Sequence, residues 1–164
     1  MDLYLTSLFL SSLLCSLVAG FLWAFACVAM PGIRRLDDLA FLEAFKAIDG
    51  VIQDRQPLFL AVWAGACVAV VVSAVLALWH LEGAHRILAV AASGLFLFGV
   101  QGPTVMVHLP LNDRLQRQDL ESLDGAAREE ICRQFEASWI RWNIVRAFFA
   151  VIASALLIGL ALNL

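Results

Sequence analysis

Four long apolar stretches dominate this chain and separate its few charged segments. They cover residues 3–30, 58–81, 87–107 and 144–162. A helix needs about 20 apolar residues to cross a bilayer, and each stretch is near that length. Of the 164 residues, 62% are hydrophobic and 15% charged, whereas a soluble domain has about a quarter charged residues. One small core cannot bury so many apolar side chains, so the sequence predicts an all-α, four-transmembrane-helix bundle.

Two longer segments, residues 31–57 and 108–143, connect the first span to the second and the third to the fourth. Apolar residues recur every three positions over residues 36–48, with charged residues between them, which predicts an amphipathic helix. It lies either on the bilayer surface or against the bundle. In the second connection, Asp124 precedes a helix that continues into the fourth span. We expect a single integral membrane domain over residues 1–164.

The basic residues predict the orientation of the spans. Ten of the 11 Lys and Arg residues lie in or beside the two long connections, and Arg86 alone lies in the short middle loop. The positive-inside rule therefore places both long connections in the cytoplasm and both termini outside. We expect a multi-pass protein of the cell inner (plasma) membrane, with the lipid bilayer and a hydrophobic small molecule as partners. Its oligomeric state stays open.

Several other classes of function are disfavoured. The net charge of −3, without a basic stripe, argues against a nucleic acid partner. No phosphate-binding loop, dinucleotide fingerprint, nucleophile elbow or haem motif occurs. His80, Glu82 and His85 lack further ligands for a metal, and the four cysteines form no CxxC pair. We expect no cofactor and no metal.

Polar side chains gather near the cytoplasmic ends of the third and fourth spans, where such groups are costly and mark candidate functional sites. One face of the third helix carries Gln101, Thr104 and His108. One face of the fourth carries Trp139, Asn143 and Arg146. Facing each other, these two groups form a polar pocket covered by tryptophan.

Arg146 is the most informative of these residues, because its guanidinium lies within an apolar run. It must reach the membrane interface or pair with an acceptor, and the candidates are Asp49, Asp113 and backbone carbonyls freed by Pro110. In the functional interpretation, Arg146 holds an anion or an enolate with its planar set of donors. In the structural interpretation, it anchors the helix at the interface or clamps two helices together.

The other candidates also have two interpretations. Asn112 and Asn143 either contact a substrate or link helices by hydrogen bonds. Trp139 and Trp142 either form a substrate wall or belong to the aromatic belt at the interface. His108 either acts as a base in a dry pocket or forms a hydrogen bond at the interface.

With these residues, the chain resembles the anthrone oxygenase-like family of small bacterial and fungal membrane proteins, many of unknown function. The matching pieces are Gly20 and Trp23 before Met30-Pro31, Phe45-x2-Ile48-Asp49-x2-Ile52 leading to Pro57-x-Phe59, Thr104 before Pro110-Leu111-Asn112-x-x-Leu115, and Trp139-x-x-Trp142-Asn143-x-x-Arg146. The last two pieces are the most specific, because Pro-x-Asn and Trp-Asn-x-x-Arg are uncommon beside membrane spans.

The resemblance implies a four-helix membrane bundle. It also implies an oxidoreductase, because characterised fungal members oxidise anthrones to anthraquinones with molecular oxygen and without an obvious cofactor motif. Asp49 and His108 stand where many relatives are expected to have asparagine, so the pocket of this chain can differ from theirs. Family membership alone transfers neither substrate nor catalysis.

Two functions follow as hypotheses. The first is an oxygen-dependent oxidase or monooxygenase of a hydrophobic, anthrone-like or quinol-like aromatic. His108 or Asp49 would take a proton, and Arg146 with Asn143 would stabilise the enolate. The substrate-binding residues would be Thr104, Asn112, Trp139, Trp142 and Asn143. The second is a non-catalytic accessory or scaffold protein, in which the same polar residues only lock helices together; whether the chain is an enzyme stays open.

Overall fold

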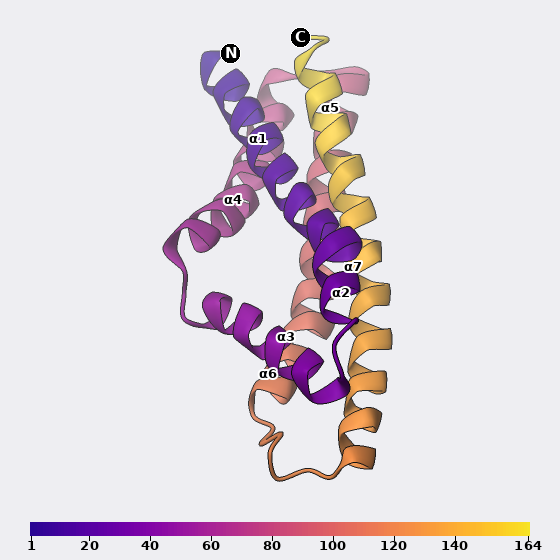
Figure 1. Cartoon of the computed structure of the whole chain (residues 1–164). Helices are drawn as coiled ribbons and strands as arrows, with labels where there is room; N and C mark the ends of the chain where they lie inside the picture. The colour runs from indigo at the N-terminus through magenta and orange to yellow at the C-terminus, as the bar shows by residue number, and fades with distance from the viewer.

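The computed structural model describes residues 1–164 and confirms the predicted all-α four-helix bundle (Figure 1). Four helical segments are long and apolar enough to cross a membrane, namely Asp2–Ile33, Pro57–His80, Gly83–Gln116 and Gly125–Ala161. The chain is therefore a multi-pass membrane protein. Both termini lie at one end of the bundle, and the two long connections lie at the other (Figure 1).

The helical segments consist of several elements each. The first contains α1 (Asp2–Ala24), the π-helical η1 (Phe25–Ala29) and α2 (Met30–Ile33). α3 (Asp38–Gln53) and α4 (Pro57–His80) follow. The third segment contains α5 (Gly83–Gly94), η2 (Leu95–Gln101), η3 (Thr104–His108) and α6 (Leu109–Gln116). The fourth is the single helix α7 (Gly125–Ala161).

Each of the three π-helical segments ends two residues before a proline, which is Pro31, Pro103 or Pro110. A proline lacks the backbone N–H, and its ring clashes with the carbonyl four residues earlier. A π-helical turn is wider than an α-helical turn and makes room for the ring without ending the helix. The third segment therefore continues to Gln116, whereas the span predicted from the sequence ends at residue 107.

Small side chains form much of the core in the half of the bundle that carries the termini. Buried alanines on α4, α5 and α7, such as Ala66, Ala92 and Ala150, let the helix backbones approach closely. The closest approach is at Gly99, where an added Cβ would lie 2.5 Å from the Phe149 ring. Small residues therefore let the helices of this half pack closely against one another.

The other half is built around α3, which packs against α6 and α7. Its buried apolar face joins a second core that consists of Met30, Phe41, Leu42, Phe45, Leu115, Leu120, Cys132, Phe135 and Trp139. The amphipathic helix predicted from the sequence is therefore confirmed, and it lies against the bundle. Asp124 caps α7 as predicted, since its carboxylate accepts a hydrogen bond from the Ala127 N–H at 2.8 Å.

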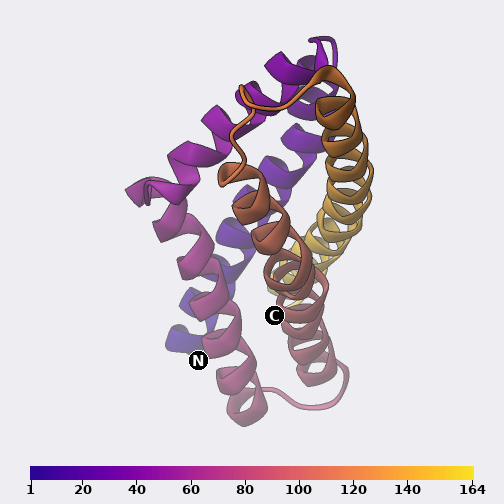
Figure 2. The same ribbon diagram turned by 90° about the horizontal axis from the view of Figure 1, so that it is seen from below.

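The two long connections meet at this end of the molecule. Viewed from below, α3 and the segment of residues 117–124 lie side by side (Figure 2). The Lys46 ammonium of α3 donates a hydrogen bond to the Gln118 carbonyl at 2.8 Å, and the Gln116 amide donates to the Lys46 carbonyl at 3.0 Å. These bonds fix α3 beside the end of α6, where it forms one wall of the site described next.

Candidate active site

A cavity of about 360 Å³ lies between α3, α4, α7 and the π-helical part of the third segment. All three π-helical segments contribute to its wall, through Phe25 of η1, Gln101 of η2, and Thr104 and His108 of η3. π-helical turns are frequent at functional sites. The prolines that cause the widened turns therefore also shape the cavity.

Aromatic rings cover one side of the cavity. Phe59 stacks on Trp63 with 5.3 Å between ring centroids, and Phe21 lies 5.4 Å from Phe59. Phe25 lies 4.9 Å from Phe21 and 5.6 Å from Trp139, so the row of rings continues to α7. Eleven of the 18 lining residues are hydrophobic, so the space fits a flat, largely apolar molecule.

The opening of the cavity faces the apolar surface of the bundle. Leu60 of α4 and Val105 and Leu109 of the third segment line the cavity and are also exposed on that surface. In a multi-pass membrane protein, such a surface contacts lipid. Part of the cavity wall therefore lies at the surface that contacts lipid.

Arg146 forms the basic wall of the cavity and is only 6% exposed. Its Nη1 donates to the Thr104 hydroxyl at 3.2 Å, and its Nε and Nη2 donate to the Asn143 side-chain oxygen at 3.2 and 3.1 Å. Its guanidinium carbon lies 5.6 Å from the centre of the Trp139 ring. Three of its five N–H groups are thus used, and two remain for a ligand.

None of the predicted acceptors pairs with Arg146. The expectation of Asp49, Asp113 or a carbonyl near Pro110 as its partner is wrong, because its hydrogen bonds go to the uncharged Asn143 and Thr104. The physical reason is that the Asp49 carboxylate is already occupied by other donors. A buried cation without a carboxylate partner is costly, which makes an anionic or polarised ligand favourable beside it.

Asp49 forms the acidic wall and is only 3% exposed. Its Oδ1 accepts from the Asn112 amide at 2.7 Å, and its Oδ2 accepts from the Gln116 amide at 2.9 Å and from the Gln53 amide at 3.3 Å. The Asn112 oxygen in turn accepts from the Trp139 indole N–H at 3.1 Å. Both carboxylate oxygens are therefore used within the protein.

His108 lies between these two walls, and neither of its ring nitrogens has a hydrogen-bond partner. Its ring meets the edge of Trp139 at 5.0 Å between centroids. The backbone carbonyl of Trp142 approaches the ring without the geometry of a hydrogen bond. A neutral imidazole always carries one nitrogen with a free lone pair, so His108 can accept a proton from a bound molecule.

Gln101 forms a pair with Trp63 that the sequence did not predict. The Trp63 indole N–H donates to the Gln101 side-chain oxygen at 2.9 Å, and the Gln101 amide nitrogen is buried without a partner. Gln101 was expected to share a helical face with Thr104 and His108, and all three line the cavity. No signal in the sequence pairs it with Trp63, which comes from a different span.

Two predicted substrate-binding residues do not line the cavity. Asn143 is fully buried behind Arg146, where its amide donates to the Leu22 carbonyl at 3.1 Å. It positions Arg146 and links α7 to α1. Trp142 lines a separate apolar groove with Pro103, and the Arg141 guanidinium lies 5.7 Å from its ring.

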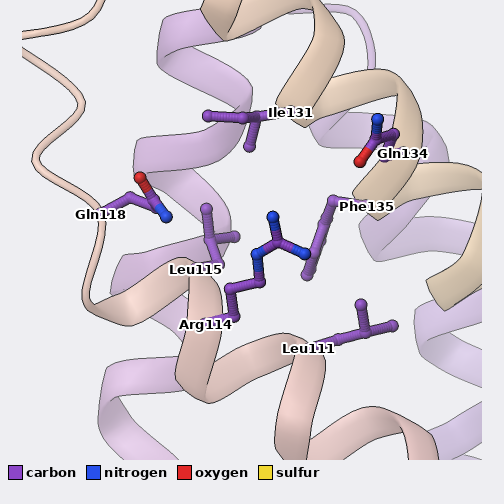
Figure 3. A pocket seen from close by; sticks show the side chains of 7 residues that line it. All are labelled: Leu111, Arg114, Leu115, Gln118, Ile131, Gln134 and Phe135. Carbon is purple, nitrogen blue, oxygen red and sulfur yellow. The ribbon is translucent and has the colours of Figure 1, made fainter.

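A second, smaller cavity of about 150 Å³ lies between α6 and the first turns of α7 (Figure 3). Arg114 extends across it toward Phe135, between Leu111 and Leu115 (Figure 3). It contains no predicted site residue, and its one charged residue is exposed. Nor does any group of three or more His, Cys, Asp or Glu side chains in the chain come together as a set of metal ligands.

The fold and the site define a multi-pass, four-helix membrane protein with a polar cavity at one end of the bundle. The family described as "Anthrone oxygenase" matches this chain over residues 55–156, well over half of its length, and the chain belongs to that family. The matched region includes Gln101, His108 and Arg146, while Asp49 and the rings from α1 and η1 lie outside it. No curated protein and no solved structure matches the chain.

Proposed function

We propose that this protein oxidises a hydrophobic aromatic ketone of the anthrone type with molecular oxygen. One observation carries this proposal. The His108 imidazole, which has no hydrogen-bond partner, lies in the same cavity as the Arg146 guanidinium, which has two unused N–H groups. A base beside a cation is the arrangement needed to remove a proton from carbon and hold the resulting anion. The family match supports the same class of substrate.

The proposed reaction begins with proton transfer. An anthrone has an acidic CH₂ group across its central ring from the ketone oxygen. His108 takes one proton from this carbon, and the two electrons of the C–H bond delocalise onto the oxygen as an enolate. Arg146 stabilises that negative charge with its two remaining N–H groups. Asn143 holds the guanidinium in place and does not touch the substrate.

Oxygen then reacts with the enolate at carbon. The enolate transfers one electron to O₂, and the resulting radical pair combines to form a C–O bond and a peroxide anion. The peroxide takes a proton from the His108 imidazolium. His108, neutral again, takes the second C–H proton, the electrons of that C–H bond form the C=O bond, and the O–O bond breaks. The departing hydroxide takes this proton from His108 and leaves as water. One O₂ is consumed for each anthrone, and no other oxidant is needed.

The non-catalytic alternative also has an observation in its favour. Arg146 and Asn143 together connect α7 to η3 and α1, as a helix clamp would. A clamp, however, does not account for a 360 Å³ cavity or for two unpartnered nitrogens on His108. In the clamp interpretation, substitutions at Arg146 lower the melting temperature, whereas in the enzyme interpretation they lower turnover.

The experiment measures oxygen uptake by the purified protein in detergent with anthrone as substrate. We expect uptake well above the rate in protein-free detergent, one O₂ per anthrone, anthraquinone as the product and no release of hydrogen peroxide. A rate equal to that of heat-denatured protein would overturn the proposal. The turnover of the His108→Phe variant then separates catalysis from adventitious oxidation.

We further propose that the cavity end of the bundle faces the cytoplasm of a cell inner (plasma) membrane. The support is the distribution of cations, since ten of 11 Lys and Arg residues belong to the elements at or near that end. A C-terminal alkaline phosphatase fusion expressed in bacteria should then be active. A fusion within residues 117–124 should be inactive, and the opposite pattern would overturn the proposed orientation.

A further inference from the structure

The Gln101 side chain presents hydrogen-bond donors to the cavity in a fixed orientation. An indole N–H can only donate, so the atom of Gln101 that faces Trp63 at 2.9 Å must be the amide oxygen. The amide NH₂ therefore faces away from Trp63, and it is buried without a partner. A buried donor without a partner is unfavourable, so a ligand that places a hydrogen-bond acceptor there gains binding free energy.

The surroundings of this amide indicate the chemistry of the ligand. Trp63 stacks on Phe59, and Phe21 meets the edge of Trp63, so flat apolar rings lie next to the free NH₂. No carboxylate accepts a hydrogen bond from Gln101 within the protein. The fitting group is a neutral oxygen acceptor on an aromatic ring, which describes a carbonyl.

The spacing along the third segment fits such a molecule. Gln101 and His108 lie seven residues apart, which is at most ~10 Å along the axis, because the π-helical turns rise less per residue than an α-helix. In an anthrone, the ketone oxygen and the acidic carbon lie on opposite sides of the central ring. That span, roughly 4 Å, plus one contact of about 3 Å at each end gives about 10 Å, a similar distance.

We propose that Gln101, oriented by Trp63, binds the ketone oxygen of the substrate and so points the opposite ring carbon toward His108. This inference rests on the proposed function, because it assigns the orientation of that substrate. Thr104 lies between Gln101 and His108 on the same segment, and Arg146 donates to its hydroxyl. Arg146 and Gln101 then share the enolate oxygen, while Trp63 acts as a positioning residue.

The test compares binding of two ligands that differ only in their oxygens, anthraquinone and anthracene, so that it needs no turnover. Binding to the purified protein in detergent is followed by quenching of tryptophan fluorescence. For Gln101→Leu we expect anthraquinone to bind about five- to tenfold more weakly and anthracene to bind within about twofold of the unaltered protein. Gln118→Leu, outside the cavity, is the matched control and should change neither.

Two further variants test orientation. Gln101→Glu keeps the shape but replaces the donor with an acceptor, and it should weaken anthraquinone binding more than Gln101→Leu does. Trp63→Phe keeps a ring but removes the indole N–H, and it should weaken anthraquinone binding less. Equal losses for both ligands in Gln101→Leu, or no loss for either, would overturn the inference. In parallel, Gln101→Leu should raise the KM for anthrone.

The two proposals fail in different ways. If the unaltered protein binds anthraquinone in a Gln101-dependent manner but consumes no oxygen with anthrone, the proposed function is wrong and the binding assignment stands. If the unaltered protein consumes oxygen with anthrone but the Gln101 substitutions leave anthraquinone binding unchanged, the assignment of Gln101 is wrong and the function stands. If it binds neither ligand, the assignment is wrong.

Discussion

The two charged walls of the cavity hold their charges in different ways. Asp49 uses both oxygens on three side-chain amides, whereas Arg146 uses three of its five N–H groups and has no carboxylate partner. The two residues are buried to a similar degree, so solvent does not explain the difference. Both oxygens of the Asp49 carboxylate therefore have partners within the protein, whereas Arg146 lines the cavity with two unused donors.

This difference separates the two base candidates. Asp49 accepts three hydrogen bonds, which are strongest to the charged carboxylate and would weaken if it took a proton, while His108 has both nitrogens free. We therefore assign Asp49 a structural role, tying α3 to α6 through Asn112 and Gln116, and assign proton transfer to His108. Substitutions at these residues and their neighbours test this division of roles.

His108→Phe should lower kcat for anthrone oxidation by about 10²–10⁴-fold, the range typical for loss of a general base. The melting temperature should stay the same or rise, because the change removes two buried nitrogens without partners. His85→Phe, at the exposed opposite end, is the control. Full activity of His108→Phe would show that His108 is not the base.

Arg146→Ala should lower kcat by about 10²–10³-fold, as expected for loss of donors to a developing oxyanion. Arg146→Lys keeps the charge but not the planar set of donors, so it should recover only part of the rate. Arg141→Ala, on the same helix outside the cavity, should stay within about twofold of the unaltered rate. A fall in melting temperature without loss of turnover in the folded fraction would identify Arg146 as a clamp.

Asp49→Ala should act mainly on stability. It leaves the amides of Asn112 and Gln116 without their acceptor, which should lower the free energy of unfolding by about 2–4 kcal/mol. The melting temperature should fall, while kcat of the protein that remains folded should change by less than about tenfold. If Asp49→Asn abolishes turnover at an unchanged melting temperature, Asp49 is the base and the comparison above is reversed.

Trp142→Phe should have the smallest effect, because Trp142 lines the groove on the other side of α7. We expect kcat and KM within about twofold of the unaltered values. Trp139→Phe, which removes the indole N–H that reaches Asn112, should raise KM more. Equal effects of the two substitutions would show that both tryptophans face the substrate.

Most of the fold was predictable from the sequence, because the signals are local. A run of about 20 apolar residues, a carboxylate that caps a helix and the regular spacing of apolar residues on α3 each act within a few turns of one helix. The end of the third span was less predictable. Pro103 and Pro110 act as helix breakers in a sequence, but the surrounding helices allowed η2 and η3 to widen and continue.

The sequence also identified most of the polar residues that meet in the cavity, since ionisable groups in apolar runs are rare and stand out. It did not identify their partners. Trp142 was expected to share a substrate wall or an aromatic belt with Trp139, but it lines a separate groove with Pro103. Asn143 was expected to touch substrate, but it lies behind Arg146.

Composition and periodicity are properties of single segments, so they were enough to predict a four-helix membrane protein with costly polar groups near one end of the bundle. Which charges are satisfied depends instead on how the helices pack. α3 packs against α6, so that the Asp49 carboxylate accepts hydrogen bonds from the amides of Asn112 and Gln116. Trp63 orients Gln101 from another span, and His108 keeps no partner. Hydrogen bonds between residues far apart in the chain depend on how the helices pack, which no local pattern encodes.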